Sequence, residues 1–298
     1  MTNPQRVLPG CLLFLAAVTA GCGKNEPVPE QKAVHDSFET RLMVPDPDLA
    51  ILIPHAAWLG TEALPPLARV YSLATDVKKR KLARLLGMLA FNGYRTRESV
   101  SALSGASREK DAGVRQLAID ALFWSAVDEK DFPGYWDPAS PDPAKPPDTA
   151  RYNRMPFEDC RERLAQLGLE GFKGSDGKLT GEPGKHPEGK PPVPSAKIAI
   201  SNMFRSETDP RVKLFAAIQT ARLGDPAPFQ YLVGLLRPPQ EGSKSTPEAD
   251  ASRAKALRVL QEVTKHNWTR YEDWSAWLAE ELKKHPQPGF TPMPPRPK

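Results

Sequence analysis

Two stretches, Asp111-Ala-Gly-Val-Arg-Gln-Leu-Ala118 and Asp209-Pro-Arg-Val-Lys-Leu-Phe-Ala216, decide the fold of this chain. In both, an Asp is followed by Val at the third position, a basic residue at the fourth and Ala at the seventh. Asp is a good N-cap because its carboxylate accepts hydrogen bonds from the free N–H groups of the first helical turn. The common offsets therefore predict that the same kind of helix begins and packs in the same way twice.

Apolar residues recur with the period of an α-helix after each Asp. After Asp111 the apolar residues share one helical face, and these are Val114, Leu117, Ala118, Ala121 and Leu122. The helix that follows Asp209 is apolar nearly all round, so we expect neighbours on both of its sides. A weaker third copy begins at Asp76, with Arg80 and Ala83 at the same offsets. The alanines let neighbouring helices approach one another closely.

Similar patterns predict helices in two blocks of the chain. The N-terminal block, 59–127, contains a helix pair over 62–90 and further helices at 96–106 and 111–126. The C-terminal block, 195–283, contains helices at 195–205, 209–223, 226–237, 248–264 and 270–283. The 33 prolines of the chain are too many for an uninterrupted array of helices, and they cluster in the stretches between and beside these blocks.

The Asp-x-x-Val-Arg-x-x-Ala pattern resembles the second helix of a HEAT repeat, a unit of two antiparallel helices with about 40 residues. The resemblance covers about 62–127 and 195–283. It implies an all-α, HEAT-like α-solenoid of antiparallel helix pairs in two blocks, with an irregular Pro/Gly-rich insert. It also implies a polar ladder between neighbouring units, built from Asp111 with Arg115 and Asp209 with Lys213. A plain cap and a solvated charge remain an alternative for all four residues.

The first residues are typical of a bacterial leader. Residues 7–21 carry no charge, and their apolar core at 12–18 is shorter than the roughly 18 residues that span a bilayer. The end, Thr19-Ala-Gly-Cys22, resembles a lipobox, although the family usually has Leu where this chain has Thr19. The resemblance implies a signal peptide over 1–21, a lipidated Cys22 and a place in the bacterial cell envelope, facing the periplasm or the exterior. Gly23 after the Cys favours the outer membrane. An ordinary secretory signal and a short uncleaved anchor are the alternatives.

Three further segments are expected to have little regular structure. Residues 22–58 form a polar tether and an extended lead-in, because Pro54 interrupts the short apolar run at 49–53. Residues 128–194 form the irregular insert, with one short helix at 156–167. Residues 284–298 form a Pro-rich, disordered tail.

Residues that could carry chemistry are sparse and scattered. Cys11 leaves with the leader and Cys22 is lipidated, so Cys160 is left without a partner for a disulfide. The histidines have no metal-ligand spacing, and no nucleophile elbow, phosphate loop or dinucleotide fingerprint occurs. We therefore expect no metal, no cofactor and no enzymatic activity. An enzyme would require residues of the insert to converge in a cleft, such as Glu158, Asp159 and His186.

The formal net charge of +5 is spread among acidic residues, which does not favour a nucleic-acid surface. The sequence instead predicts a protein-protein interaction scaffold that binds an unidentified envelope protein and holds membrane lipid through Cys22. Its contacts are expected at exposed positions such as Arg95, Arg97, Tyr135 and Trp136. The alternative is an envelope binding subunit that recognises cell-wall glycan or peptide through the side chains of Trp268, Trp274 and Trp277. Those rings could equally seal the open end of the helical array.

Overall fold

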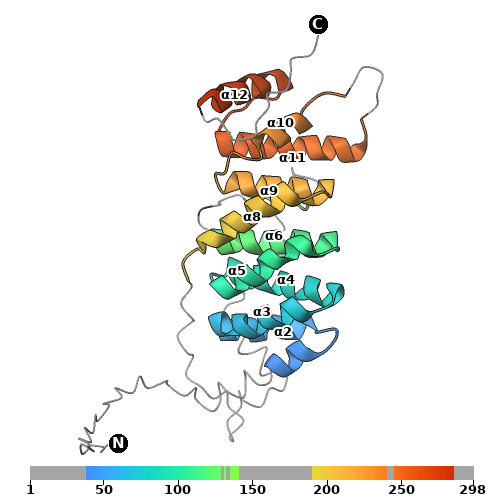
Figure 1. Ribbon diagram of the computed structural model, residues 1–298, viewed down its shortest axis with the longest axis vertical. Coiled ribbons are helices and arrows are strands. Elements are labelled where there is room, and N and C mark those ends of the chain that lie inside the picture. Colours follow the sequence, from blue (N-terminus) through green and yellow to red (C-terminus); the bar gives the residue numbers. More distant parts are fainter. Residues whose placement is uncertain (1–37, 129–130, 132–134, 141–189, 240–244, 285–298) are drawn as a thin grey trace, which may run out of the picture.

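The computed structural model describes residues 38–128, 131, 135–140, 190–239 and 245–284. All regular structure in these ranges is helical, and the helices pack side by side along the long axis, with the N-terminal helices at one end and the C-terminal helices at the other (Figure 1). The predicted all-α class is therefore confirmed. The leader, Cys22, the helix expected at 156–167 and the Pro-rich tail lie outside the described residues.

Most helices begin and end close to their predicted positions. In the first half these are α3 (Leu64–Leu73), α4 (Asp76–Phe91), α5 (Arg97–Ser104) and α6 (Ala112–Ala126), with short 3-10 turns at Gly60–Ala63 and Gly105–Arg108. In the second half they are α8 (Pro194–Ser206), α9 (Pro210–Arg222), α10 (Phe229–Leu235), α11 (Pro247–Thr264) and α12 (Tyr271–Lys284). The helices predicted in both blocks are confirmed.

Helix α2 (Leu49–Leu59) replaces the extended lead-in that the sequence suggested. Asp48 caps it, because its Oδ1 accepts a hydrogen bond from Ala50 N at 2.8 Å. Pro54 lies inside the helix and removes one backbone donor, which disfavours a helix in isolation. Burial of apolar side chains such as Leu52 and Leu59 against the rest of the fold offsets this loss, since α2 packs on α4. The expectation of an extended segment was wrong because it weighed the proline and overlooked the cap.

The two Asp residues of the sequence motif are confirmed as N-caps. Asp111 Oδ1 accepts from Val114 N at 2.8 Å at the start of α6. Asp209 Oδ1 accepts from Arg211 N and Val212 N at 2.9 and 3.1 Å at the start of α9. The weaker copy differs, because Asp76 is the first residue of α4 rather than its cap.

Helices contact partners nearby in the chain, and several contact the second helix along the chain more extensively than the first. Helix α3 contacts α4 and α5, α4 contacts α6, α6 contacts α8 and α9, and α9 contacts α11. Small residues allow the closest approach, since a Cβ added to Gly87 of α4 would lie 3.4 Å from the Cβ of Ala121 in α6. The buried apolar side chains form one cluster that extends from Phe38 to Trp274.

The helices before and after residues 141–189 pack directly on one another. Helices α5 and α6 both contact α8, which follows that segment. The returning chain is held by backbone hydrogen bonds from Lys190 N to Gly93 O and from Val193 N to Ser125 O, each 2.8 Å long. The two predicted blocks are therefore joined into one helical body within the described residues.

His55 of α2 is fully buried, and neither of its ring nitrogens has a hydrogen-bond partner within the described part of the chain. Burial and, to a smaller extent, the charge of Arg41 lower the pKa of His55 from 6.5 to about 4. The edge of the Phe38 ring faces the imidazole, with 6.0 Å between the ring centroids. The folded protein therefore holds this imidazole in its neutral form at neutral pH.

This burial makes stability depend on pH. Between pH 6.5 and about 4 the unfolded chain binds a proton on His55 that the folded chain does not, so the free energy of unfolding falls as the pH drops. The contribution of this single site is at most about 1.4 kcal/mol per pH unit. We expect the His55→Leu variant to lose this part of the slope when urea unfolding is measured at pH 7, 5.5 and 4.5. Equal slopes in the variant and the wild type would contradict the assignment.

Candidate functional site

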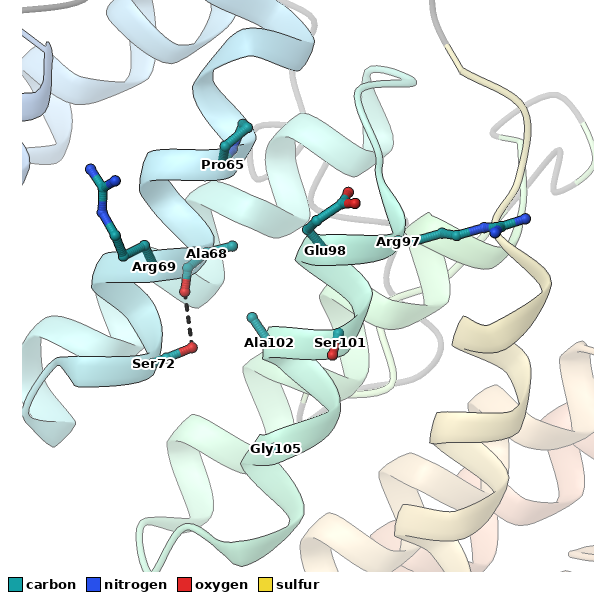
Figure 2. Close-up of a pocket in the computed structure, with 9 residues that line it drawn as sticks. All are labelled: Pro65, Ala68, Arg69, Ser72, Arg97, Glu98, Ser101, Ala102 and Gly105. Atoms are coloured by element: carbon teal, nitrogen blue, oxygen red, sulfur yellow. Dashed lines mark hydrogen bonds between the residues drawn. The ribbon is translucent and has the colours of Figure 1, made fainter. Parts of the chain in front are cut away.

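A shallow, open groove between α3 and α5 is a candidate contact surface (Figure 2). Its volume is about 680 Å³, and it is lined by Pro65, Ala68, Arg69, Ser72, Arg97, Glu98, Ser101, Ala102 and Gly105. Ala68 and Ala102 lie between the two helices, whereas the guanidinium groups of Arg69 and Arg97 project outward on opposite sides. The groove therefore combines small side chains in its centre with charged groups at its borders.

The ends of the groove are fixed by local contacts. At the start of α5, Thr96 Oγ1 accepts from Ser99 N and Ser99 Oγ accepts from Thr96 N, both at 3.2 Å, which is a capping box. Hydrogen bonds from the Glu98 backbone N–H and from the Thr96 hydroxyl lower the pKa of Glu98, and the charge of Arg97 adds a smaller effect. On the α3 side, Arg69 forms a 3.2 Å ion pair with Glu39. Both walls of the groove thus belong to well-defined helices.

A line of ion pairs links the stretches that begin at Asp76, Asp111 and Asp209, which we call the Asp stretches. Arg80, the basic residue of the first, binds Asp111, the cap of the second, with 2.9 Å between Nε and Oδ1. This hydrogen bond is the main cause that lowers the pKa of Asp111. The adjacent Lys79 forms a 2.8 Å ion pair with Glu109.

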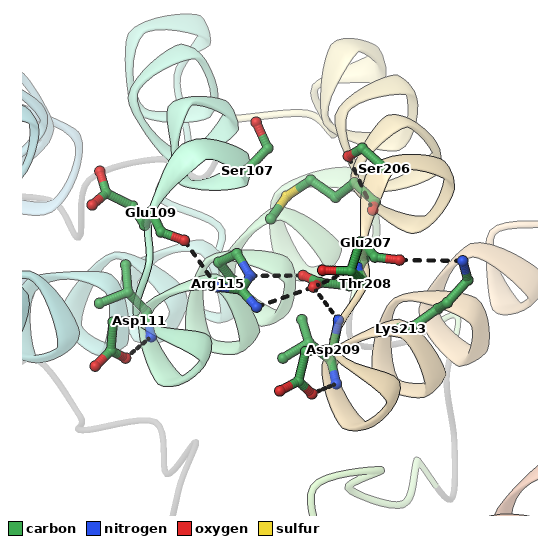
Figure 3. A network of polar contacts seen from close by, with 12 residues as sticks. Ser107, Glu109, Asp111, Arg115, Ser206, Glu207, Thr208, Asp209 and Lys213 are labelled. Atoms are coloured by element: carbon green, nitrogen blue, oxygen red, sulfur yellow. Dashed lines mark hydrogen bonds and ion pairs between the residues drawn. The ribbon is translucent and has the colours of Figure 1, made fainter.

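The next link is made by Arg115 and Glu207 (Figure 3). Arg115 Nε donates to Glu207 Oε2 at 2.7 Å and Nη2 donates to Oε1 at 3.0 Å, so the pair is bidentate. The side chains of Glu207 and Arg115 are only 5% and 12% exposed. The hydrogen bond to Glu207 is the main cause that raises the pKa of Arg115, and the charges of Asp209 and Asp111 act in the same direction.

Glu207 also positions the start of α9. Its Oε1 accepts from the backbone N–H groups of Thr208 and Asp209 at 2.9 and 2.8 Å (Figure 3). Lys213, the basic residue of this Asp stretch, donates from Nζ to the carbonyl oxygen of Glu207 at 3.2 Å and lies over the rings of Phe204 and Tyr231. The Glu207 carboxylate therefore connects Arg115 of α6 to the residues that begin α9.

The structure shows which partners the sequence reasoning missed. The resemblance assigned Asp111 with Arg115 and Asp209 with Lys213, whereas the direct bonds join Arg80 to Asp111 and Arg115 to Glu207. The sequence contained a usable signal for this pairing. A Glu precedes the Asp by two residues in both strong Asp stretches, at Glu109 and Glu207, and each binds a basic residue of the preceding stretch.

Tyr135 and Trp136 are buried, contrary to the exposure expected from the sequence. Trp136 is 3% exposed, and its Nε1 donates to Glu262 Oε2 at 2.7 Å. The guanidinium of Arg222 lies 4.5 Å from the Tyr135 ring centroid and 4.6 Å from that of Trp136, and it also binds Glu262. The two aromatic rings thus cover a buried cation instead of offering a contact surface.

Residues 135–140 contact three helices, α6, α9 and α11, and so link them to one another. The Tyr135 ring packs on Trp124 of α6 with 4.8 Å between centroids, and Gln219 of α9 donates to the Tyr135 hydroxyl at 3.1 Å. Lys255 of α11 donates to the carbonyl oxygen of Pro138 at 2.8 Å. Part of the predicted insert therefore belongs to the core.

The two arginines expected to be exposed differ from one another. Arg95 is 3% exposed, and it donates to the carbonyl oxygens of Lys190 and Trp124 at 2.9 and 3.0 Å and binds Asp128. Its role is to hold the chain that returns after residue 189, so the expected exposure was wrong. Arg97 is exposed at the border of the groove, as predicted.

The C-terminal tryptophans pack on one another. Trp274 is fully buried, and its Nε1 donates to the carbonyl oxygen of Trp268 at 3.2 Å. Its ring meets those of Trp268 and Trp277 edge-on at 5.2 and 5.7 Å, and both of these rings are partly buried against the core. His266 stacks on Trp268 at 4.0 Å. The cluster covers the end of the helical row and does not form a flat platform of three open rings.

Metal sites and membrane-spanning helices were also sought among the residues that the structure describes. No group of three or more His, Cys, Asp and Glu residues among them could bind a metal ion. None of the helices in the described ranges is long and apolar enough to cross a membrane. Glu158, Asp159 and His186 lie outside these ranges. Comparisons with protein-family models, curated proteins and solved structures find no match.

The Arg115–Glu207 pair predicts an unequal response to two arginine substitutions. Arg115→Ala leaves the carboxylate of Glu207 buried without its guanidinium, and we expect a loss of about 3–5 kcal/mol in the free energy of unfolding. Arg80→Ala removes an ion pair whose arginine is 53% exposed, and we expect a loss of about 1 kcal/mol or less. Urea denaturation of both variants measures the difference, and similar small losses would contradict a structural role for Arg115.

Proposed function

We propose that this chain is a lipid-anchored, HEAT-like helical-repeat protein of a bacterial envelope that acts as a protein-protein interaction scaffold. The observation that carries the proposal is the contact pattern of the helices. The contacts form two series along the row. In one, α3 contacts α5 and α5 contacts α8; in the other, α4 contacts α6, α6 contacts α9 and α9 contacts α11. Such nearest-neighbour packing is typical of α-solenoids, which use their long surfaces for binding.

The polar links between the Asp stretches support the same assignment. Arg80 with Asp111 and Arg115 with Glu207 are related contacts, because in each the basic residue of one Asp stretch binds an acid at, or two residues before, the Asp that begins the next stretch. A repeated contact between successive units is expected when each unit is stabilised mainly by its neighbours. The repeated relationship therefore favours a stack of similar helix pairs over an irregular helical bundle.

The groove between α3 and α5 is the surface on which we place the partner. Its centre is built from small side chains such as Ala68 and Ala102, which leave room for the side chains of a bound segment. Arg97 is exposed at its border and can pair with a carboxylate of the partner. These features fit a peptide segment of an envelope protein that has apolar residues next to an acidic one.

The membrane attachment is assigned to Cys22. Its position lies 16 residues before Phe38, which is the first described residue, by the difference of the two residue numbers. A chain of that length reaches at most about 58 Å when fully extended. A lipidated Cys22 would therefore keep the helical row close to the membrane, with attachment favoured at the outer membrane.

The alternative function, recognition of cell-wall glycan or peptide through tryptophans, has less support. Trp274, the central ring of the cluster, is fully buried, so it has no face left for a ligand. Trp268 and Trp277 are partly buried and pack against the core. An aromatic binding platform needs exposed ring faces. The contacts of these tryptophans favour their role as a cover of the helical end.

A groove-filling substitution tests the proposed partner site. Ser101 is exposed and lines the groove, so Ser101→Trp fills the space without removing a buried contact. We expect the chain without residues 1–21 to capture a specific protein from envelope extract, and Ser101→Trp to reduce this capture at least tenfold. The matched control is Lys197→Trp at an exposed position of α8. Equal capture by both variants, or a loss with both, would contradict the groove as the site.

A second experiment tests the anchor alone. The wild-type protein is expected to enter the detergent phase in a phase-separation assay of whole cells, because its lipid chains are inserted there. The Cys22→Ala variant is expected to stay in the aqueous phase or to keep its leader. If both proteins partition in the same way and have the same mass, Cys22 is not lipidated.

A further inference from the structure

Residues 135–140 lie on helices α6, α9 and α11 in the way that a bound peptide lies on a receptor. Side chains of the helices donate to main-chain carbonyl oxygens of the segment, from Arg222 Nη2 to Trp136 O at 3.1 Å and from Lys255 Nζ to Pro138 O at 2.8 Å. Because the backbone groups inside a helix already pair with one another, side chains are the groups that a helical surface can use to hold an extended segment.

The first aromatic side chain of the segment has its own place on the helices. The Tyr135 ring packs on Phe123 and Trp124 of α6, with 5.7 and 4.8 Å between the ring centroids. Its hydroxyl accepts a hydrogen bond from Gln219 of α9 at 3.1 Å. This place therefore fits a ring that carries a hydroxyl at its far end.

The second aromatic side chain is bound by charges. The guanidinium groups of Arg222 and Arg258 lie 4.6 and 4.7 Å from the centroid of the Trp136 ring. Its Nε1 donates to Glu262 Oε2 at 2.7 Å. Cations over the ring and a carboxylate at the indole N–H favour tryptophan over phenylalanine, because phenylalanine has no N–H to donate.

An acid and a proline follow the two rings and turn the chain. Ala139 N donates to Asp137 Oδ1 at 2.8 Å, and Ser140 N donates to the Asp137 carbonyl oxygen at 2.9 Å. Asp137 lies close enough to Lys255 for their opposite charges to attract. The helices therefore bind a defined pattern, which is Tyr-Trp-Asp-Pro in this chain.

The helices keep their own polar contacts when the segment is left out of account. Arg222 Nε donates to Glu262 Oε1 at 3.0 Å and Nη2 donates to Oε2 at 3.1 Å, so this buried cation has a carboxylate partner besides the segment. Helix α6 contacts α9, and α9 contacts α11, along the row (Figure 1). The three helices therefore build the site by themselves.

We propose that this face of α6, α9 and α11 is a recognition site for an extended segment with two adjacent aromatic residues followed by an acid and a proline. Residues 135–140 fill the site in cis. The external ligand is a segment of a partner protein with the same pattern, and it binds only in place of residues 135–140, so the chain's own segment is an autoinhibitory contact. This inference goes beyond the groove between α3 and α5, and it requires neither that groove nor the lipid anchor.

The test offers the segment in trans, as a fluorescein-labelled peptide with the sequence of residues 131–140. In the full chain, the double variant Tyr135→Ala/Trp136→Ala vacates the site and leaves every helix residue in place. By fluorescence anisotropy, we expect the peptide to bind this variant at least tenfold more tightly than the wild type, whose own segment occupies the site. Equal binding to the two proteins, or binding to neither, would overturn the proposal.

Two further peptides test the recognised pattern. A peptide with Trp136→Phe lacks the N–H that Glu262 accepts, and we expect it to bind the double variant at least fivefold more weakly. A peptide with the same residues in scrambled order is the matched control, and we expect no binding. If the scrambled peptide binds as tightly as the original, the site does not recognise the pattern and the proposal fails.

A folding control keeps the test decisive, because the double variant loses two buried rings. Its helical circular dichroism is compared with that of the wild type before the peptide is added. If the variant has lost helical signal, we expect the original peptide to restore it and the scrambled peptide to leave it unchanged. No recovery with the original peptide would contradict the proposal.

Discussion

The guanidinium of Arg115 is the contact on which the described body depends. It binds both carboxylate oxygens of Glu207, 92 residues later in the chain, and the carbonyl oxygens of Glu109 and Lys110 at 2.9 Å. Glu207 in turn accepts from the N–H groups that precede α9. One side chain therefore fixes the loop before α6 and the start of α9, and it closes the row of helices across the segment between them. Because both partners are nearly buried, loss of either one leaves an unpaired charge inside the protein.

Local signals explain what the sequence analysis predicted well. The helices from α3 to α12 follow from apolar periodicity and from caps such as Asp111 and Asp209, which depend on residues only a few positions apart. Predictions failed where the deciding partner lies far along the chain. Trp136 was expected on the surface, yet its partner Glu262 is 126 residues away and invisible to a local pattern. Arg95 was misjudged for the same reason, since it binds the carbonyl oxygen of Lys190.

The groove illustrates a second limit. Its lining comes from small residues on two helices, and a sequence pattern does not show that Ala68 and Ala102 leave a space between them. The burial of Tyr135, Trp136 and Trp274 removes the aromatic side chains that a sequence reader would choose first as binding groups.

The central claim is that the helices on both sides of residues 141–189 form one body. The direct measurement replaces part of that segment with the recognition sequence of a specific protease and follows the cut protein by size-exclusion chromatography under native conditions. We expect the two fragments to co-elute at the size of the intact chain and to keep its helical circular dichroism, because α5 and α6 pack on α8 and α9. Elution as two separate, smaller species would show that the two blocks are independent, and it would contradict the account.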